Sequence, residues 1–104
     1  QIADLRLGIE QEIQEALLNL QSASEQVAVA KDGQDLAQRE LELAQDRFQS
    51  GVTNNVEVST AQDELARAQE NYIVAVSGHV DAKFALARAA GNAEKNIGQY
   101  LGKP

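Results

Sequence analysis

Alanines and larger, mostly apolar residues alternate at heptad spacing through two stretches of the chain. In each stretch an alanine recurs at every seventh position, and one larger residue falls between successive alanines at spacings of four and three. Such spacing is typical of the seam of a left-handed coiled coil. We therefore predict two long helices with alanine-rich heptad seams. The seam of the first comprises Ala16, Leu20, Ala23, Val27, Ala30, Gln34, Ala37, Leu41, Ala44 and Phe48, and that of the second comprises Val58, Ala61, Leu65, Ala68, Tyr72, Ala75, His79, Ala82, Leu86 and Ala89.

A cluster of turn-forming residues separates the two seams. Gly51 suits the C-terminal end of a helix, where a residue must accept a positive φ. Asn54 can cap the next helix, and Glu57, three residues later, completes a pattern that resembles a capping box. These signals predict a helix over about residues 2–50, a tip at 51–55 and a second helix over about 55–90.

The two seams match when the chain is folded back at this tip. Ala44 then faces Ala61 and Ala37 faces Ala68, and the residue numbers of facing alanines always add to the same total, as antiparallel pairing requires. We therefore predict an all-α fold, a long antiparallel two-helix coiled-coil hairpin that forms a single domain over residues 1–104. Gly91 is expected to end the second helix and to be followed by a short C-terminal helical segment at 92–101.

Each predicted helix carries a second apolar stripe outside its seam. Because the seam already uses one face of each helix, these residues would remain in water in an isolated hairpin. We expect them to pack laterally against further helices, in an oligomer or in a longer parent chain of which this stretch is a fragment. The stripes are Val29, Leu36 and Leu43 on the first helix and Ile73, Val76, Val80 and Phe84 on the second.

Charge and chemistry narrow the function. The formal net charge is −7, which disfavours nucleic acid as a partner. No cysteine is present, and the single histidine, His79, is best explained as a structural seam residue, since no partners for catalysis or metal binding accompany it. Most carboxylates fit a solvated helix face, and the acidic lining of a cation-attracting pore is the alternative. We predict a protein that is not an enzyme and has no catalytic residue, cofactor or metal.

The segment 47–62, RFQSGVTNNVEVSTAQ, resembles the periplasmic tip of TolC-type outer-membrane efflux proteins. Members of that family carry an Arg and aromatic pair, a glycine, a turn with Thr or Asn, an acid flanked by Val, and an Ala-Gln pair. The resemblance continues through the second arm to the segment 85–91, ALARAAG, and includes the segment 15–20, EALLNL, in the first arm.

The resemblance implies a location and a set of site residues. Such proteins are trimers whose chains supply β-strands to an outer-membrane barrel and long helices to a periplasmic tunnel. This stretch resembles the periplasmic hairpin of the C-terminal half, and contact with the membrane is left to barrel strands outside it. Glu57 corresponds to the acid after the turn, near the tunnel entrance, and Thr60 stands where some members have a second acid. The residues that correspond to the adaptor-docking tip are Gly51, Val52, Thr53, Asn54 and Asn55.

The function implied is that of a passive export conduit in the outer membrane. Its tip would dock to a periplasmic adaptor and, through it, to an inner-membrane transporter, as in multidrug export or type I secretion of proteins. Two alternatives stay open: the coiled-coil hairpin of a periplasmic adaptor itself, and a generic structural coiled coil. The flanking gene sequence discriminates them, because a channel requires a related second half and alternating strands, whereas an adaptor requires β segments on either side of the hairpin.

Overall fold

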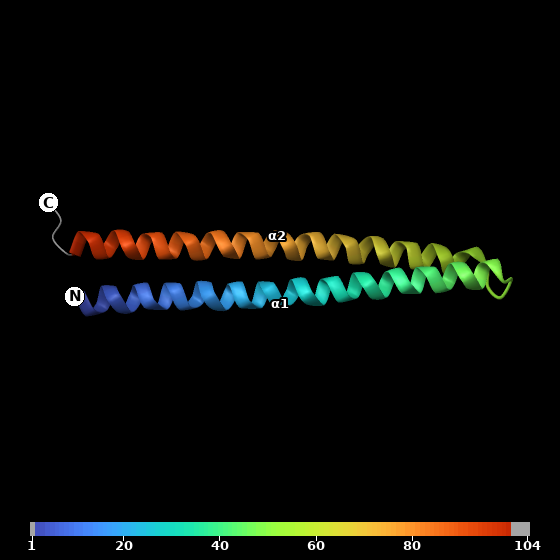
Figure 1. The fold of residues 1–104 in the computed structure, drawn as a ribbon, viewed down its shortest axis with the longest axis horizontal. Helices are drawn as coiled ribbons and strands as arrows, with labels where there is room; N and C mark the ends of the chain where they lie inside the picture. The colour runs from blue at the N-terminus through green and yellow to red at the C-terminus, as the bar shows by residue number, and fades with distance from the viewer. Residues whose placement is uncertain (1, 101–104) are drawn as a thin grey trace. The chain divides into compact units, whose positions relative to one another are not determined.

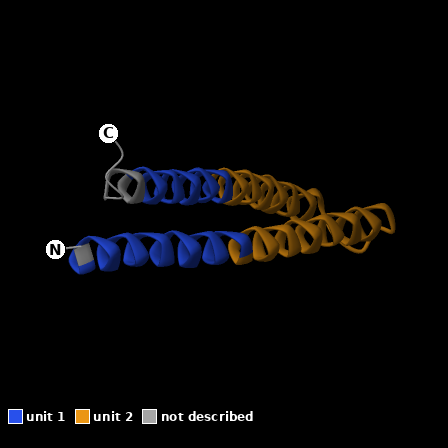
Figure 2. Ribbon diagram, turned by 60° about the vertical axis from the view of Figure 1, so that its left-hand side comes forward, with its two compact units in different colours: residues 1–24, 78–104 blue, residues 25–77 orange. Residues whose placement is uncertain are grey.

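The computed structural model describes residues 2–100, and within them the side chains of residues 3–95. Two helices, α1 (Ile2–Gln49) and α2 (Asn55–Tyr100), are joined by one turn, and the described residues contain no strand (Figure 1). Both helices are rich in Ala, Leu, Glu and Gln, which have the highest helix propensities. The predicted all-α hairpin is confirmed. The chain divides into two compact units, each built from part of α1 and part of α2 (Figure 2).

The unit formed by residues 25–77 contains the turn, and its burial follows the predicted seam. Ala44, Val58 and Ala61 form a buried cluster against which Leu41 packs. This cluster confirms that the chain folds back in the register that pairs Ala44 with Ala61. Farther from the turn Ala37 is buried, and other seam positions are half-buried: Val27, Ala30, Gln34, Leu65, Ala68, Tyr72 and Ala75.

Phe48 departs from the expected seam. Its facing residue Val58 is only 8% exposed, but Phe48 itself is 47% exposed. Phe48 lies one residue before the end of α1, and the turn that follows supplies no further layer of side chains to cover the ring. The seam therefore closes at Ala44 and Val58, and the last turn of α1 leaves an aromatic surface open to solvent.

The second unit comprises residues 1–24 and 78–104 and is described for 2–24 and 78–100. Its buried residues are again alanines, namely Ala16, Ala89 and Ala93. Small side chains at these positions allow the two backbones to approach closely, so little apolar volume is needed to exclude water. The other seam residues of this unit are half-buried: Leu20, Ala23, His79, Ala82 and Leu86. Leu5, Ile9 and Ile13, which precede the predicted seam, are half-buried as well.

The predicted end of the second helix at about residue 90 is wrong. α2 continues without a break to Tyr100, and Gly91 does not adopt the positive φ of a helix C-cap. Buried Ala93 continues the seam beyond Gly91, so tertiary packing carries the helix past a local stop signal. The segment predicted at 92–101 is therefore the end of α2 as far as Tyr100, and residue 101 lies outside the described residues.

Both apolar stripes outside the seam are largely open to solvent. Val29, Leu36 and Leu43 on α1 are each more than half exposed, as are Ile73 and Phe84 on α2. Val80 is 41% exposed and Val76 is half-buried. Their lateral packing stays a prediction. Within the part of the chain that the structure describes, neither helix has a segment apolar enough to serve as a membrane span.

Candidate functional site

The turn after α1 is closed by backbone hydrogen bonds around Gly51. The Gly51 N–H donates to the Phe48 carbonyl at 3.0 Å, and the Val52 N–H donates to the Arg47 carbonyl at 2.9 Å. This pair of bonds is the Schellman motif, which satisfies carbonyls left without partners at a helix end. Gly51 has φ +76°, a conformation that costs an L side chain about 1–2 kcal/mol. The predicted role of Gly51 at the helix end is confirmed.

The start of α2 is capped by Asn54. Its side-chain Oδ1 accepts a hydrogen bond from the Val56 N–H at 3.1 Å. This is the geometry of an N-cap residue, whose side chain replaces the missing backbone acceptor at the second helical position. Since both helix ends at the turn have their own hydrogen bonds, the turn has a defined conformation that does not depend on a partner.

Glu57 makes a different contact from the one expected. Instead of the capping-box bond to residue 54, its Oε1 lies 3.1 Å from Nε of Arg47. The ion pair joins the last turn of α1 to the first turn of α2, and each charge also suits the dipole of its own helix end. Arg47 was not among the predicted site residues. The signal was present in the sequence, because the antiparallel register places these two opposite charges beside facing seam positions.

An exposed apolar surface lies at the turn. Val52 is 65% exposed and Val56 is 68% exposed, and half-exposed Phe48 lies in the adjoining end of α1. We call Val52 and Val56 the tip valines. Of the predicted tip residues, Gly51, Val52, Asn54 and Asn55 are exposed and Thr53 is half-buried, so the structure brings the five together in the turn and the first residue of α2. Val56 was missed because it belongs to the helix rather than to the turn motif.

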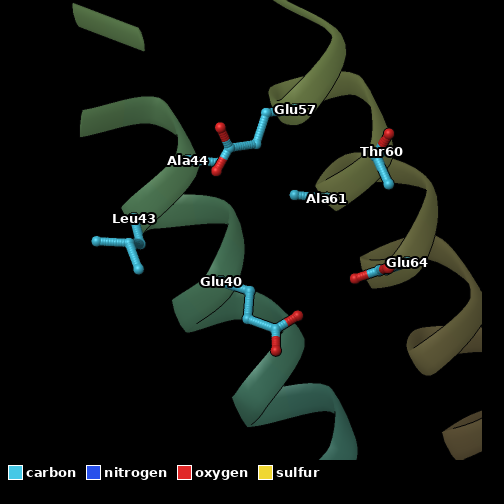
Figure 3. Close-up of a pocket in the computed structure, with 7 residues that line it drawn as sticks. All are labelled: Glu40, Leu43, Ala44, Glu57, Thr60, Ala61 and Glu64. Carbon is cyan, nitrogen blue, oxygen red and sulfur yellow. The ribbon is translucent and has the colours of Figure 1, made fainter. Parts of the chain in front are cut away.

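Carboxylates line an open groove between the two helices just below the turn. Figure 3 shows Glu57 reaching from α2 toward α1, while Glu40 and Glu64 extend toward each other. Leu43 also lines the groove, and its side chain extends away from α2. Among the described residues, no group of three or more His, Cys, Asp or Glu is arranged to hold a metal ion. The arrangement places carboxylates along the groove below the exposed tip valines.

Comparison with known proteins gives one result. The sequence profile of the family described as outer membrane efflux protein matches residues 2–92, which include the turn and nearly all of both helices. Searches of curated proteins and of solved structures returned no match. Because the matched segment covers most of the chain, the resemblance inferred from the tip motif is confirmed. The chain belongs to the outer membrane efflux protein family.

Proposed function

We propose that the chain is one helical hairpin of the periplasmic tunnel of an outer-membrane export channel, and that its tip docks to a periplasmic adaptor. The observation that carries the proposal is the tip itself. The two tip valines are about two-thirds exposed on a turn whose backbone is already hydrogen-bonded. Exposed apolar side chains on an ordered turn can contact a partner at little cost in conformational entropy.

The exposed stripes support the role of a tunnel wall element. A hairpin that worked alone would leave Val29, Leu36 and Leu43 in water along one helix, and Ile73 and Phe84 along the other. Packing against neighbouring hairpins removes this apolar surface from water, at about 25 cal/mol for each Å². In the proposed assembly three chains form the channel, whose location is the outer membrane with this hairpin on the periplasmic side.

The proposed role requires no reaction at the hairpin. A conduit passes its cargo without making or breaking bonds, and the energy comes from an inner-membrane transporter connected through the adaptor. No cofactor is needed for this role. We therefore propose a passive conduit rather than an enzyme, for multidrug export or type I secretion.

An export assay with the complete gene product tests the proposal. Replacing both tip valines, as Val52→Asp and Val56→Asp, places charges where an apolar contact is proposed, so export of a fluorescent substrate should fall to near the level of a deletion strain. Protein abundance and helix content should not change, because neither side chain belongs to the buried seam. A matched control is Val74→Asp, which puts the same charge on an equally exposed valine of α2 that belongs to neither the tip, the seam nor the stripes.

Two results would contradict the proposal. Export that is unchanged in the double variant would show that the tip does not dock. A complete gene that places β segments of the adaptor type on either side of this hairpin, without a related second half, would favour the alternative in which the chain is the adaptor's own hairpin.

A further inference from the structure

We propose that the Arg47–Glu57 ion pair is a positioning element that holds the tip valines in the arrangement the adaptor recognises. This inference rests on the proposed docking function and adds two residues to it that do not belong to the turn. Neither residue needs to touch the adaptor. Their role is to keep the last turn of α1 and the first turn of α2 at a fixed separation.

The geometry connects the pair to both tip valines. The Arg47 carbonyl accepts the hydrogen bond from the Val52 N–H at 2.9 Å, and the Arg47 side chain contacts Glu57 at 3.1 Å. Glu57 follows Val56 directly, and the Val56 N–H is held by Asn54. The ion pair therefore links the two tip valines across the helices: Val52 is bonded to Arg47, and Val56 directly precedes Glu57.

The turn does not need the ion pair in order to fold. The three backbone hydrogen bonds after α1 and the Asn54 cap before α2 already define its path. The charged side chains are 47% and 41% exposed, and exposed ion pairs contribute little to the stability of a fold. The ion pair instead restricts the relative motion of the two helix ends. It thereby limits the range of conformations that the tip valines adopt before binding.

A double-mutant cycle isolates this role. Arg47→Gln, Glu57→Gln and the variant with both changes keep side chains of similar length and remove the charges. The complete gene product is immobilised, and its affinity for the purified periplasmic adaptor of the same organism is measured by surface plasmon resonance. We expect each single change to weaken binding about two- to fivefold, and the double variant to bind no more weakly than the weaker of the two single variants.

Glu64→Gln is the matched control. Glu64 lines the same groove and carries the same charge as Glu57, but among the described residues it forms no ion pair. Its removal should leave the affinity within twofold of the unchanged protein. A loss equal to that of Glu57→Gln would show that general charge in the groove, rather than the pair, matters.

Hydrogen exchange supplies a readout that is independent of the adaptor. In the 104-residue chain, the amides of Val52 and Val56 should exchange about two- to fivefold faster in either single variant, while the amides of Ala37 and Ala68 in the seam keep their rates.

Unchanged exchange and affinity in both single variants would overturn the inference, and so would additive losses in the cycle, which would mean that each charge contacts the adaptor on its own. If Val52→Asp and Val56→Asp together leave adaptor binding intact, the docking proposal fails. The positioning role of the ion pair in binding then fails with it. If that variant loses adaptor binding but the losses in the double-mutant cycle are additive, only the positioning role of the ion pair is rejected.

Discussion

Replacement of Ala61 by leucine tests the alanine seam most sharply. Ala61 is 7% exposed and lies in the buried cluster with Ala44, which is 3% exposed, and Val58. Leucine adds three carbon atoms at a point where the two helices meet through alanine side chains. The added atoms must push the backbones apart or force strained rotamers, and overpacking of this kind costs about 1–3 kcal/mol. Helix propensity contributes little to the difference, because alanine and leucine are both strong helix formers.

The measurement is urea unfolding of the 104-residue chain, followed by circular dichroism. Ala66→Leu is the control, since Ala66 lies in the same helix but is exposed. We expect the urea midpoint to fall for Ala61→Leu, with an unchanged slope. For Ala66→Leu the free energy of unfolding should stay within about 0.5 kcal/mol of that of the unchanged chain. If Ala61→Leu is as stable as the control or more so, close approach of the helices through alanine is not what holds this part of the hairpin together.

Three further changes have defined outcomes. Gly51→Val should lower the free energy of unfolding by about 1–2 kcal/mol without loss of helical circular dichroism signal, because valine must adopt the φ of +76° at the turn; a large loss of helicity would make Gly51 a residue required for folding. Asn54→Ala should cost about 0.5–2 kcal/mol in urea unfolding through loss of the cap to Val56, whereas Asn55→Ala should not, and equal effects would refute the cap. Gly33→Ala should raise the melting temperature, since nothing lies within 4 Å of the added Cβ and alanine favours the helix by about 1 kcal/mol; an unchanged or lower value would reveal a packing role for Gly33.

The sequence predicted the parts of the fold that depend on repetition. The alanine heptads recur in both arms, so their shared register could be worked out from residue numbers alone, and the cluster of Ala44 and Ala61 confirms it. Gly51 and Asn54 were also predictable, because each solves a local problem of backbone geometry at a helix end.

What the sequence did not predict depends on competition between local and tertiary contacts. Glu57 could bond its own helix end or Arg47 across the turn, which the register places nearby. Only the folded arrangement shows that the contact with Arg47 is the one that forms. Gly91 is a stop signal by itself, but Ala93 packs in the seam beyond it and the helix continues. Phe48 fits the heptad and is nevertheless half-exposed. The pattern could not predict this exposure, because it does not show that the layers of the seam end at the turn.

For the candidate site, the resemblance located the turn but not the surface that it presents. The turn motif drew attention to residues 51–55, whereas the most exposed apolar side chain of the tip belongs to Val56, inside α2. The direction of a side chain at the first turn of a helix follows from the cap geometry, which the sequence indicates only once the N-cap residue has been fixed.

Site-specific cross-linking from the tip tests the central claim most directly. This chain contains no cysteine, so single cysteines can be introduced into it as Val52→Cys at the turn and as Val29→Cys far from the turn in α1. Each variant of the complete gene product is labelled with a short photoactivatable reagent and mixed with the purified periplasmic adaptor. We predict that the adaptor is captured from position 52 and not from position 29. Capture from position 29 alone, or equal capture from both positions, would contradict docking through the hairpin tip.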